Sequence, residues 1–170
     1  CCTGNGSRAI YYAWQSILNF RNGALRINLL LNRSSPWADI SSHIPYTGRV
    51  DVQVKKACRL EVRIPEWVEP GQVTCSVNGG SRDIRFRGRY AQVGEVGAGD
   101  LVTVSFPISE KSLKTRIGGV MYDVILKGST VVQMSPPGRL NPYYQRAHYR
   151  GNTTRWVERE RFVADTQLDW

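Results

Sequence analysis

Residues 58–64 read CRLEVRI, and this stretch decides the fold. Apolar side chains stand at every second position and charged side chains stand between them, with Pro65 directly after. Successive side chains of a β-strand point to opposite faces, so this alternation predicts a strand with one buried and one solvated face. Proline cannot donate a hydrogen bond to a neighbouring strand, so the strand is expected to end at Pro65.

The same period of two recurs along most of the chain. It marks residues 25–31, 50–54, 73–77, 84–86, 90–96 and 101–106, and residues 122–126 and 131–134 add two more apolar strands. Turn-forming residues separate these runs, such as the Asn78-Gly79-Gly80 that follows one of them. Short alternating strands at this spacing predict a mainly β fold, an antiparallel β-sandwich of jelly-roll type over residues 23–135.

One helix is expected near the start of the chain. From Arg8 to Asn19, apolar side chains recur with the spacing of one helical stripe. Asn22-Gly23 is expected to end this helix. Near the other end, Ser135-Pro136-Pro137-Gly138 breaks the pattern. Residues 136–170 are therefore predicted to be an extended or strand-rich C-terminal extension.

The composition indicates a folded protein with a basic surface. Among 170 residues are five Trp, eight Tyr and four Phe, which can bury a core and exclude disorder. No apolar run approaches the ~20 residues of a membrane span, so no membrane partner is expected. The net charge is +9, but there is no run of five basic residues and no nucleic-acid-binding motif. We therefore expect no nucleic-acid partner. An acidic polysaccharide is as compatible with the positive charge as a nucleic acid is.

Two of the four cysteines and both histidines are interpreted as structural residues. Cys58 and Cys75 each share the apolar face of a predicted strand, as free thiols in a core do. A disulfide between them is the alternative. His43 and His148 lack the spacing of metal ligands and are predicted to be polar surface residues.

Three segments together resemble a known family. They are CCTGNGSRAIYY at residues 1–12, VRIPEW at 62–67 with Val77-Asn78-Gly79, and GDLVTVSFP at 99–107. In this order they resemble the C-terminal part of the β-L-arabinofuranosidase-type glycoside hydrolases. The cysteine pair that opens a helix, at this distance from the strand motifs, is the most specific element.

The resemblance implies an (α/α)6 catalytic barrel followed by β-sandwich domains. Residues 1–22 would then be the last helix of a truncated barrel, and the chain, which opens on Cys1 without a methionine, is expected to end a longer enzyme. Cys1 would be the catalytic nucleophile, and Cys1 and Cys2 would be metal ligands for the Zn of the intact enzyme. The family's remaining ligands, a Glu and a Cys, and its acid/base Glu lie upstream. The isolated chain is therefore expected to be inactive and to hold no Zn.

The resemblance also sets expectations for substrate and partners. Thr3-Gly4 stands where the family's arabinofuranosidases often carry Pro-Pro, which suggests another subfamily with another sugar. The implied partners are a plant or microbial glycan and the catalytic barrel of the same protein. A location in the bacterial cytoplasm, in the periplasm or outside the cell is compatible with these residues.

Two other functions stay open for the sandwich. It could bind carbohydrate by stacking sugars on exposed aromatic side chains. The candidates are Trp37, Tyr46, Trp67, Tyr143, Tyr144 and Trp156. Alternatively, it could be a purely structural domain that braces the barrel. In that case the lone helix, with Tyr12 and Trp14, is expected to expose an apolar patch.

Overall fold

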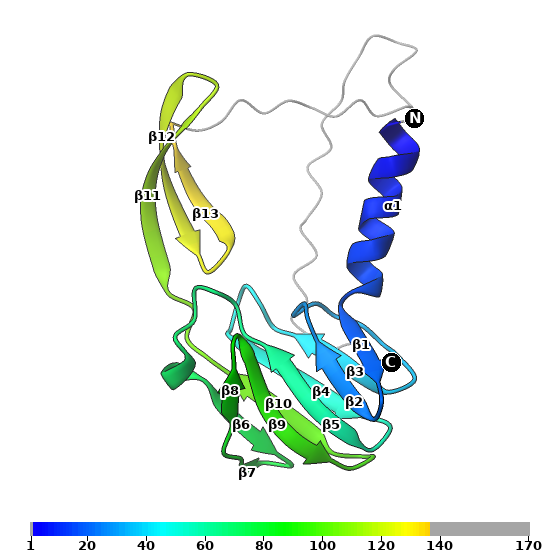
Figure 1. The fold of residues 1–170 in the computed structure, drawn as a ribbon. Helices are drawn as coiled ribbons and strands as arrows, with labels where there is room; N and C mark the ends of the chain where they lie inside the picture. The colour runs from blue at the N-terminus through cyan, green and yellow to red at the C-terminus, as the bar shows by residue number, and fades with distance from the viewer. Residues whose placement is uncertain (1, 137–170) are drawn as a thin grey trace, which may run out of the picture. The chain divides into compact units, whose positions relative to one another are not determined.

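A computed structural model describes residues 2–136, with only the backbone for Cys2 and Thr3. Within this range lie one α-helix, α1 (Cys2–Gln15), a short 3₁₀ helix (Pro70–Gln72) and strands β1 to β13 (Figure 1). The mainly β, antiparallel fold predicted from the alternation is confirmed. No helix in the described range is long and apolar enough to span a membrane.

Two five-stranded sheets face each other and form the sandwich. In spatial order the first sheet is β1 (Leu18–Arg21), β2 (Ala24–Ile27), β5 (Cys58–Arg63), β9 (Tyr90–Val96) and β8 (Arg85–Arg87). The second is β3 (Ala38–Ser42), β4 (Arg49–Val54), β10 (Leu101–Ser105), β6 (Thr74–Val77) and β7 (Gly80–Ser81). All pairs within these sheets are antiparallel except β2 and β5, which are parallel.

The hydrophobic core lies between these two sheets. Leu60, Val62 and Ile64 are fully buried, as the alternation in residues 58–64 predicts. Val50 and Val52 of β4 are fully buried in the same cluster. Burying one such side chain contributes about 1.5–3 kcal/mol, so this layer is the main source of the sandwich's stability.

The helix occupies different residues from the predicted Arg8–Asn19. It ends at Gln15, and β1 follows as a strand that pairs with β2. Asn22 and Gly23 join the two strands with φ angles of 51° and 74°. This left-handed backbone is the one that two-residue hairpin turns require, and Asn-Gly is their strongest sequence signal. Asn22-Gly23 therefore closes a hairpin instead of ending a helix.

The sandwich also has different limits from the predicted 23–135. It begins at β1, inside the range 1–22 that was expected to be helical, because Leu18 packs in the core. After β10, strands β11 (Glu110–Ile117), β12 (Val120–Lys127) and β13 (Thr130–Ser135) form a separate three-stranded sheet. The predicted C-terminal extension lies outside the described residues, apart from its first residue.

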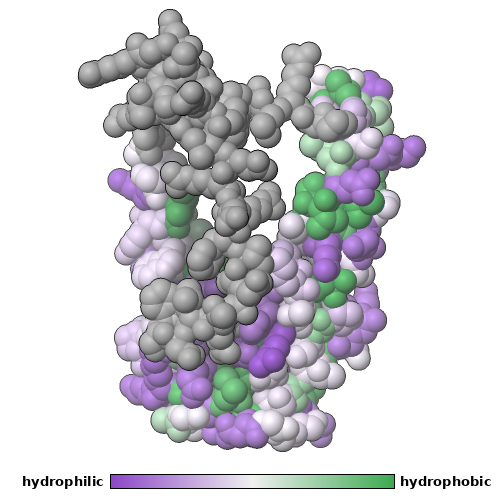
Figure 2. Space-filling view, turned by 180° about the vertical axis from the view of Figure 1, so that it is seen from behind, coloured by the Kyte–Doolittle hydropathy of each residue, from purple (hydrophilic) through white to green (hydrophobic). Residues whose placement is uncertain are grey.

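The three-stranded sheet exposes many apolar side chains. Ile117, Val120, Met121, Val131 and Val132 are each between 46% and 55% exposed. Figure 2 shows hydrophobic surface on the side where this sheet lies. In the described residues only Val124 of this sheet is a buried hydrophobic residue, so the sheet has little core of its own.

Candidate functional site

Of the predicted catalytic and zinc-binding pair, the structure describes only the backbone of Cys2. Cys1 is outside the described residues, and Cys2 is the first residue of the helix. The N-terminal end of a helix favours negative charge, and nearby positive potential favours a thiolate. No three His, Cys, Asp or Glu side chains in the described part of the chain are grouped to hold a metal ion. The roles of Cys1 and Cys2 stay predictions.

Beyond this pair, α1 is exposed on every side. All side chains from Gly4 to Gln15 are exposed, including Ile10 at 74% and Trp14 at 50%. The ring centroid of Tyr11 lies 5.9 Å from that of Tyr12 and 6.2 Å from that of Trp14. The apolar patch that the sequence predicts on this helix is therefore confirmed.

Arg33 ties the C-terminal end of α1 to the sandwich. Its Nη1 donates to the carbonyl oxygens of Trp14 and Gln15 at 2.8 and 2.9 Å. Its guanidinium lies 4.2 Å from the centroid of the Trp14 ring. Backbone hydrogen bonds in both directions with Ile40 join Arg33 to β3. The last carbonyls of a helix lack partners within it, so a cation here satisfies them and complements the helix dipole.

The sequence gives no signal for this anchor. Arg33 is one of many basic residues and lies 18 positions after Gln15, in a loop. Burial lowers the pKa of Arg33 from its ordinary value, but a guanidinium keeps its proton at neutral pH. The side chain therefore stays a cation in contact with the helix end.

The two cysteines of the sandwich are free and buried. Cys58 lies in β5 and Cys75 in β6, in opposite sheets, and no disulfide joins them. The prediction of core thiols is confirmed and the disulfide alternative is wrong. Burial raises the pKa of both thiols, so neither carries the thiolate that nucleophilic chemistry needs.

Asp51 of β4 is the centre of a buried polar cluster. Its Oδ1 accepts hydrogen bonds from Thr103 Oγ1 at 2.7 Å and from Arg49 Nε at 3.0 Å. Its Oδ2 lies 2.9 Å from Arg49 Nη2 and 3.0 Å from His43 Nε2. Burial acts to raise the pKa of Asp51, but the hydrogen bonds from these three side chains lower it below its usual range. His43, predicted to lie on the surface, is instead half-buried against this carboxylate.

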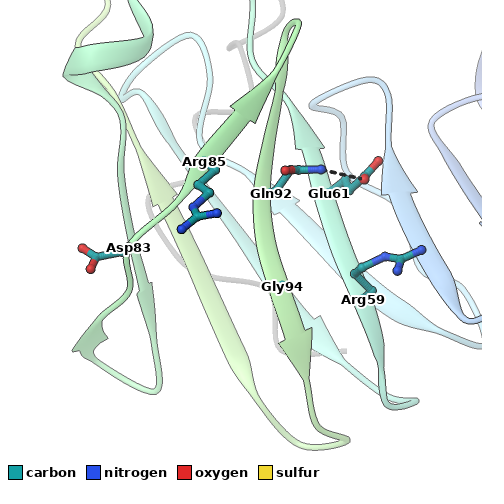
Figure 3. Close-up of a pocket in the computed structure, with 6 residues that line it drawn as sticks. All are labelled: Arg59, Glu61, Asp83, Arg85, Gln92 and Gly94. Carbon is teal, nitrogen blue, oxygen red and sulfur yellow. Dashed lines mark hydrogen bonds between the residues drawn. The ribbon is translucent and has the colours of Figure 1, made fainter.

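A second polar cluster borders a shallow hollow on the outer face of the first sheet. The hollow has a volume of about 290 Å³. It is lined by Arg59, Glu61, Asp83, Arg85, Gln92 and Gly94 (Figure 3). Arg26 holds Glu61 Oε2 at 2.8 and 2.9 Å through Nη2 and Nε, and Gln92 donates to Oε1 at 3.4 Å. Burial acts to raise the pKa of Glu61, but the Arg26 and Gln92 hydrogen bonds lower it. This carboxylate is therefore ionised, and both of its oxygens already have hydrogen-bond partners.

The three-stranded sheet carries another hollow of about 380 Å³. It is lined by Ser112, Leu113, Lys114, Asp123, Val124, Ile125, Gln133 and Ser135. Lys114 and Asp123 face each other there at 3.6 Å, and both are largely exposed. This hollow therefore offers neither a buried charge nor a polar group that is held for chemistry.

The aromatic candidates do not form a common surface within the described residues. Trp37 stacks on Phe20 at 5.3 Å, and Trp67 packs edge-on against Phe106 at 5.8 Å. Both tryptophans pack against the core, and Tyr46 alone of the described candidates is largely exposed. Tyr143, Tyr144 and Trp156 lie outside the described residues.

A family profile and several solved structures relate this chain to known proteins. The profile of the family described as "Beta-L-arabinofuranosidase, GH127 middle domain" matches residues 14–108. This range includes the whole sandwich and the end of α1 with its Arg33 anchor. A comparison with curated proteins gives no match.

Solved structures share the fold. A chain described as a glycoside hydrolase has a TM-score of 0.61 and 21% identity, over 77% of this chain and 24% of its own. A GH127 β-L-arabinofuranosidase from Geobacillus stearothermophilus T6 has a TM-score of 0.56 and 22% identity, over 77% and 23%. A GH127 β-arabinofuranosidase has a TM-score of 0.50 and 19% identity, over 68% and 23%. The present chain thus spans about a quarter of these structures.

Proposed function

This chain belongs to the GH127 β-L-arabinofuranosidase family, whose middle-domain profile it matches, and on that premise we propose that it is part of a retaining glycoside hydrolase. The proposed substrate is the terminal sugar of a plant or microbial glycan, with β-L-arabinofuranosides as the first to test. The observation that carries the proposal is the order of the elements. A helix that begins at Cys2 leads directly into the sandwich that the family profile matches.

In the proposed reaction, the Cys1 thiolate attacks the anomeric carbon of the sugar. The carbon–sulfur bond forms as the bond to the leaving oxygen breaks, and a general acid protonates that oxygen. The group that served as the acid then acts as a base and takes a proton from a water molecule, which displaces the thiolate from the anomeric carbon. The anomeric configuration is retained. The resemblance to the family implies that the acid/base group is a glutamate of the barrel, upstream of Cys1.

Zinc fits the donor chemistry of the cysteine pair. Cys1 and Cys2 would supply two thiolates, which are ligands that zinc prefers, and residues of the barrel would complete the site. When bound, the metal supplies positive charge that keeps a thiol deprotonated. The position at the start of α1 adds the positive end of the helix dipole to the same effect.

The exposure of α1 supports a barrel as its partner. An isolated helix of 14 residues is marginal in water, and α1 packs no side chain between Gly4 and Gln15 into the core. Ile10, Tyr11, Tyr12 and Trp14 are the apolar residues that neighbouring helices of a barrel would cover. Under this proposal the sandwich braces the barrel, and Arg33 joins the two.

The test uses the polypeptide that carries this chain together with the barrel. Hydrolysis of an aryl β-L-arabinofuranoside, and of a panel of other aryl glycosides, is measured for wild type and for Cys1→Ser. We expect at least one substrate to be cleaved and Cys1→Ser to abolish the activity. Cys75→Ala is the control, because it removes a buried thiol in the sandwich. A Cys1→Ser enzyme with full activity would contradict the nucleophile assignment.

A second candidate function is carbohydrate binding by the sandwich alone. It is favoured by the hollow on the first sheet, which the exposed side chains of Arg59 and Arg85 line.

A further inference from the structure

The outer face of the first sheet carries a concentration of arginines. Arg26 of β2, Arg59 and Arg63 of β5, and Arg85 and Arg87 of β8 all extend from neighbouring strands of this sheet. Arg85 and Arg87 stand at alternate positions of β8, and both are exposed. Only the sheet topology shows that β8 and β5 bring their arginines to either side of β9.

Two carboxylates neutralise three of these five arginines. Glu61 Oε2 lies 2.8 Å from Arg26 Nη2, and Glu61 Oε1 lies 3.7 Å from Arg87 Nη2. Glu66 lies 3.3 Å from Arg63. Arg59 and Arg85 form no ion pair with any residue in the described range, although both are exposed at the hollow.

The hollow between Arg59 and Arg85 has the features of a small binding site. Gly94 leaves it open, since nothing lies within 4 Å of where a Cβ would be. Gln92 is held toward Glu61 by a hydrogen bond, which leaves its amide oxygen free to accept (Figure 3). In Figure 3 the Asp83 carboxylate points away from Arg85 and Gln92, and the Arg59 guanidinium extends away from Gly94. The guanidinium groups of Arg59 and Arg85 therefore lie on opposite sides of β9.

We propose that this hollow and its borders bind an acidic oligosaccharide that lies across β9, with one uronic acid carboxylate held by Arg85 and another by Arg59. The planar guanidinium donates two parallel hydrogen bonds to a carboxylate, a geometry that lysine does not provide. The amide oxygen of Gln92 offers an acceptor for a hydroxyl group of the sugar ring. The volume of about 290 Å³ suits one or two sugar residues, so longer chains would extend along the basic face. This binding does not require Cys1. A failure of the proposed catalysis would therefore leave the binding proposal unchanged, and a failure of the binding would leave the catalytic proposal unchanged.

The experiment measures binding of oligogalacturonate to the full 170-residue chain by isothermal titration calorimetry. The fully methyl-esterified oligosaccharide has the same rings without the charge, and double-stranded DNA of similar charge tests for general polyanion binding. Arg59→Gln combined with Arg85→Gln removes the two free cations. Lys111→Gln combined with Arg116→Gln is the matched control, because it removes two exposed positive charges from β11, outside the hollow.

We expect the acid to bind and the methyl ester and DNA to bind at least tenfold more weakly. The Arg59/Arg85 double variant is expected to lose about a hundredfold in affinity, since each charge-assisted hydrogen-bonded contact is worth about tenfold or more. The Lys111/Arg116 variant is expected to stay within about threefold of wild type, because exposed charges at a distance are screened. Asp83→Asn removes a negative charge at the rim and is expected to bind slightly more tightly.

Three results would overturn the proposal. One is a double variant at Arg59 and Arg85 that is folded by circular dichroism and binds like wild type. Another is equal binding of the acid and its methyl ester, which would mean that the carboxylate is not recognised. The third is DNA binding as tight as that of the oligosaccharide and equally dependent on both arginine pairs, which would show a general polyanion surface.

Discussion

Replacing Arg33 by alanine tests how α1, and with it the cysteine pair, is held on the sandwich. The substitution removes two hydrogen bonds to the carbonyls of Trp14 and Gln15 and one contact with the Trp14 ring. At exposed positions each hydrogen bond is worth about 0.5–1.5 kcal/mol and the ring contact about 0.5–1 kcal/mol. The sum is about 1.5–4 kcal/mol, and a value of about 2 kcal/mol, toward its lower end, corresponds to a change of about thirtyfold in a local opening equilibrium.

Native-state hydrogen exchange of the isolated chain measures this opening residue by residue. Amides in the last turns of α1 are expected to exchange about thirtyfold faster in Arg33→Ala, while those of β5 and β9 keep their protection. Arg33→Lys keeps the positive charge but replaces the planar guanidinium by an ammonium group, so the exchange rate in α1 should be intermediate. Arg21→Ala removes an exposed arginine of β1 and serves as the control. Unchanged exchange in α1 for Arg33→Ala would refute the anchor.

Three further predictions concern the sandwich. Leu60→Ala is expected to lower the free energy of unfolding by about 2–5 kcal/mol in urea titrations, because Leu60 is fully buried, and a loss below 1 kcal/mol would contradict its place in the core. Cys58 and Cys75 should resist iodoacetamide in the native protein and react in denaturant, as mass spectrometry of their peptides would show, because burial raises the pKa of both thiols. Asp51 and Glu61 have lowered pKa values in the folded state, so their stabilisation is complete above the ordinary carboxyl pKa of about 4 and is lost as pH falls through the lower folded pKa. Asp51→Asn should therefore unfold at lower urea concentration at pH 7 and lose less stability than wild type between pH 7 and 3; an identical pH dependence would contradict this.

Several elements could be predicted from the sequence because short-range patterns specify them. The alternation in residues 90–96 gave the bounds of β9 as the structure has them, and that in 58–64 gave β5 to within one residue. β11 was missed because most of its side chains are exposed and polar, so no period of two marks it. Its position depends on pairing with β12, which the chain reaches only after the turn at Gly118 and Gly119.

The N-terminal region shows where the local pattern misleads. Leu18 fits the helical stripe and also fits a strand, and a single stripe does not distinguish them. The choice is made by tertiary contact, because Leu18 fills the core next to Ile27 when β1 pairs with β2. The Asn22-Gly23 signal is compatible with both a helix end and a hairpin, and it becomes a hairpin turn only when both flanking strands pack on the sandwich.

For the candidate sites, the sequence by itself determined the family resemblance, the cysteine pair and the identity of the core thiols. These depend on residue type and near neighbours, which a sequence displays directly. Only the tertiary structure decided that Arg33 holds the end of α1, that Asp51 gathers His43, Arg49 and Thr103, and that Arg59 and Arg85 share one hollow. Each of these brings together residues from different strands or loops, and such distances are set by sheet order and register, which residue spacing does not reveal.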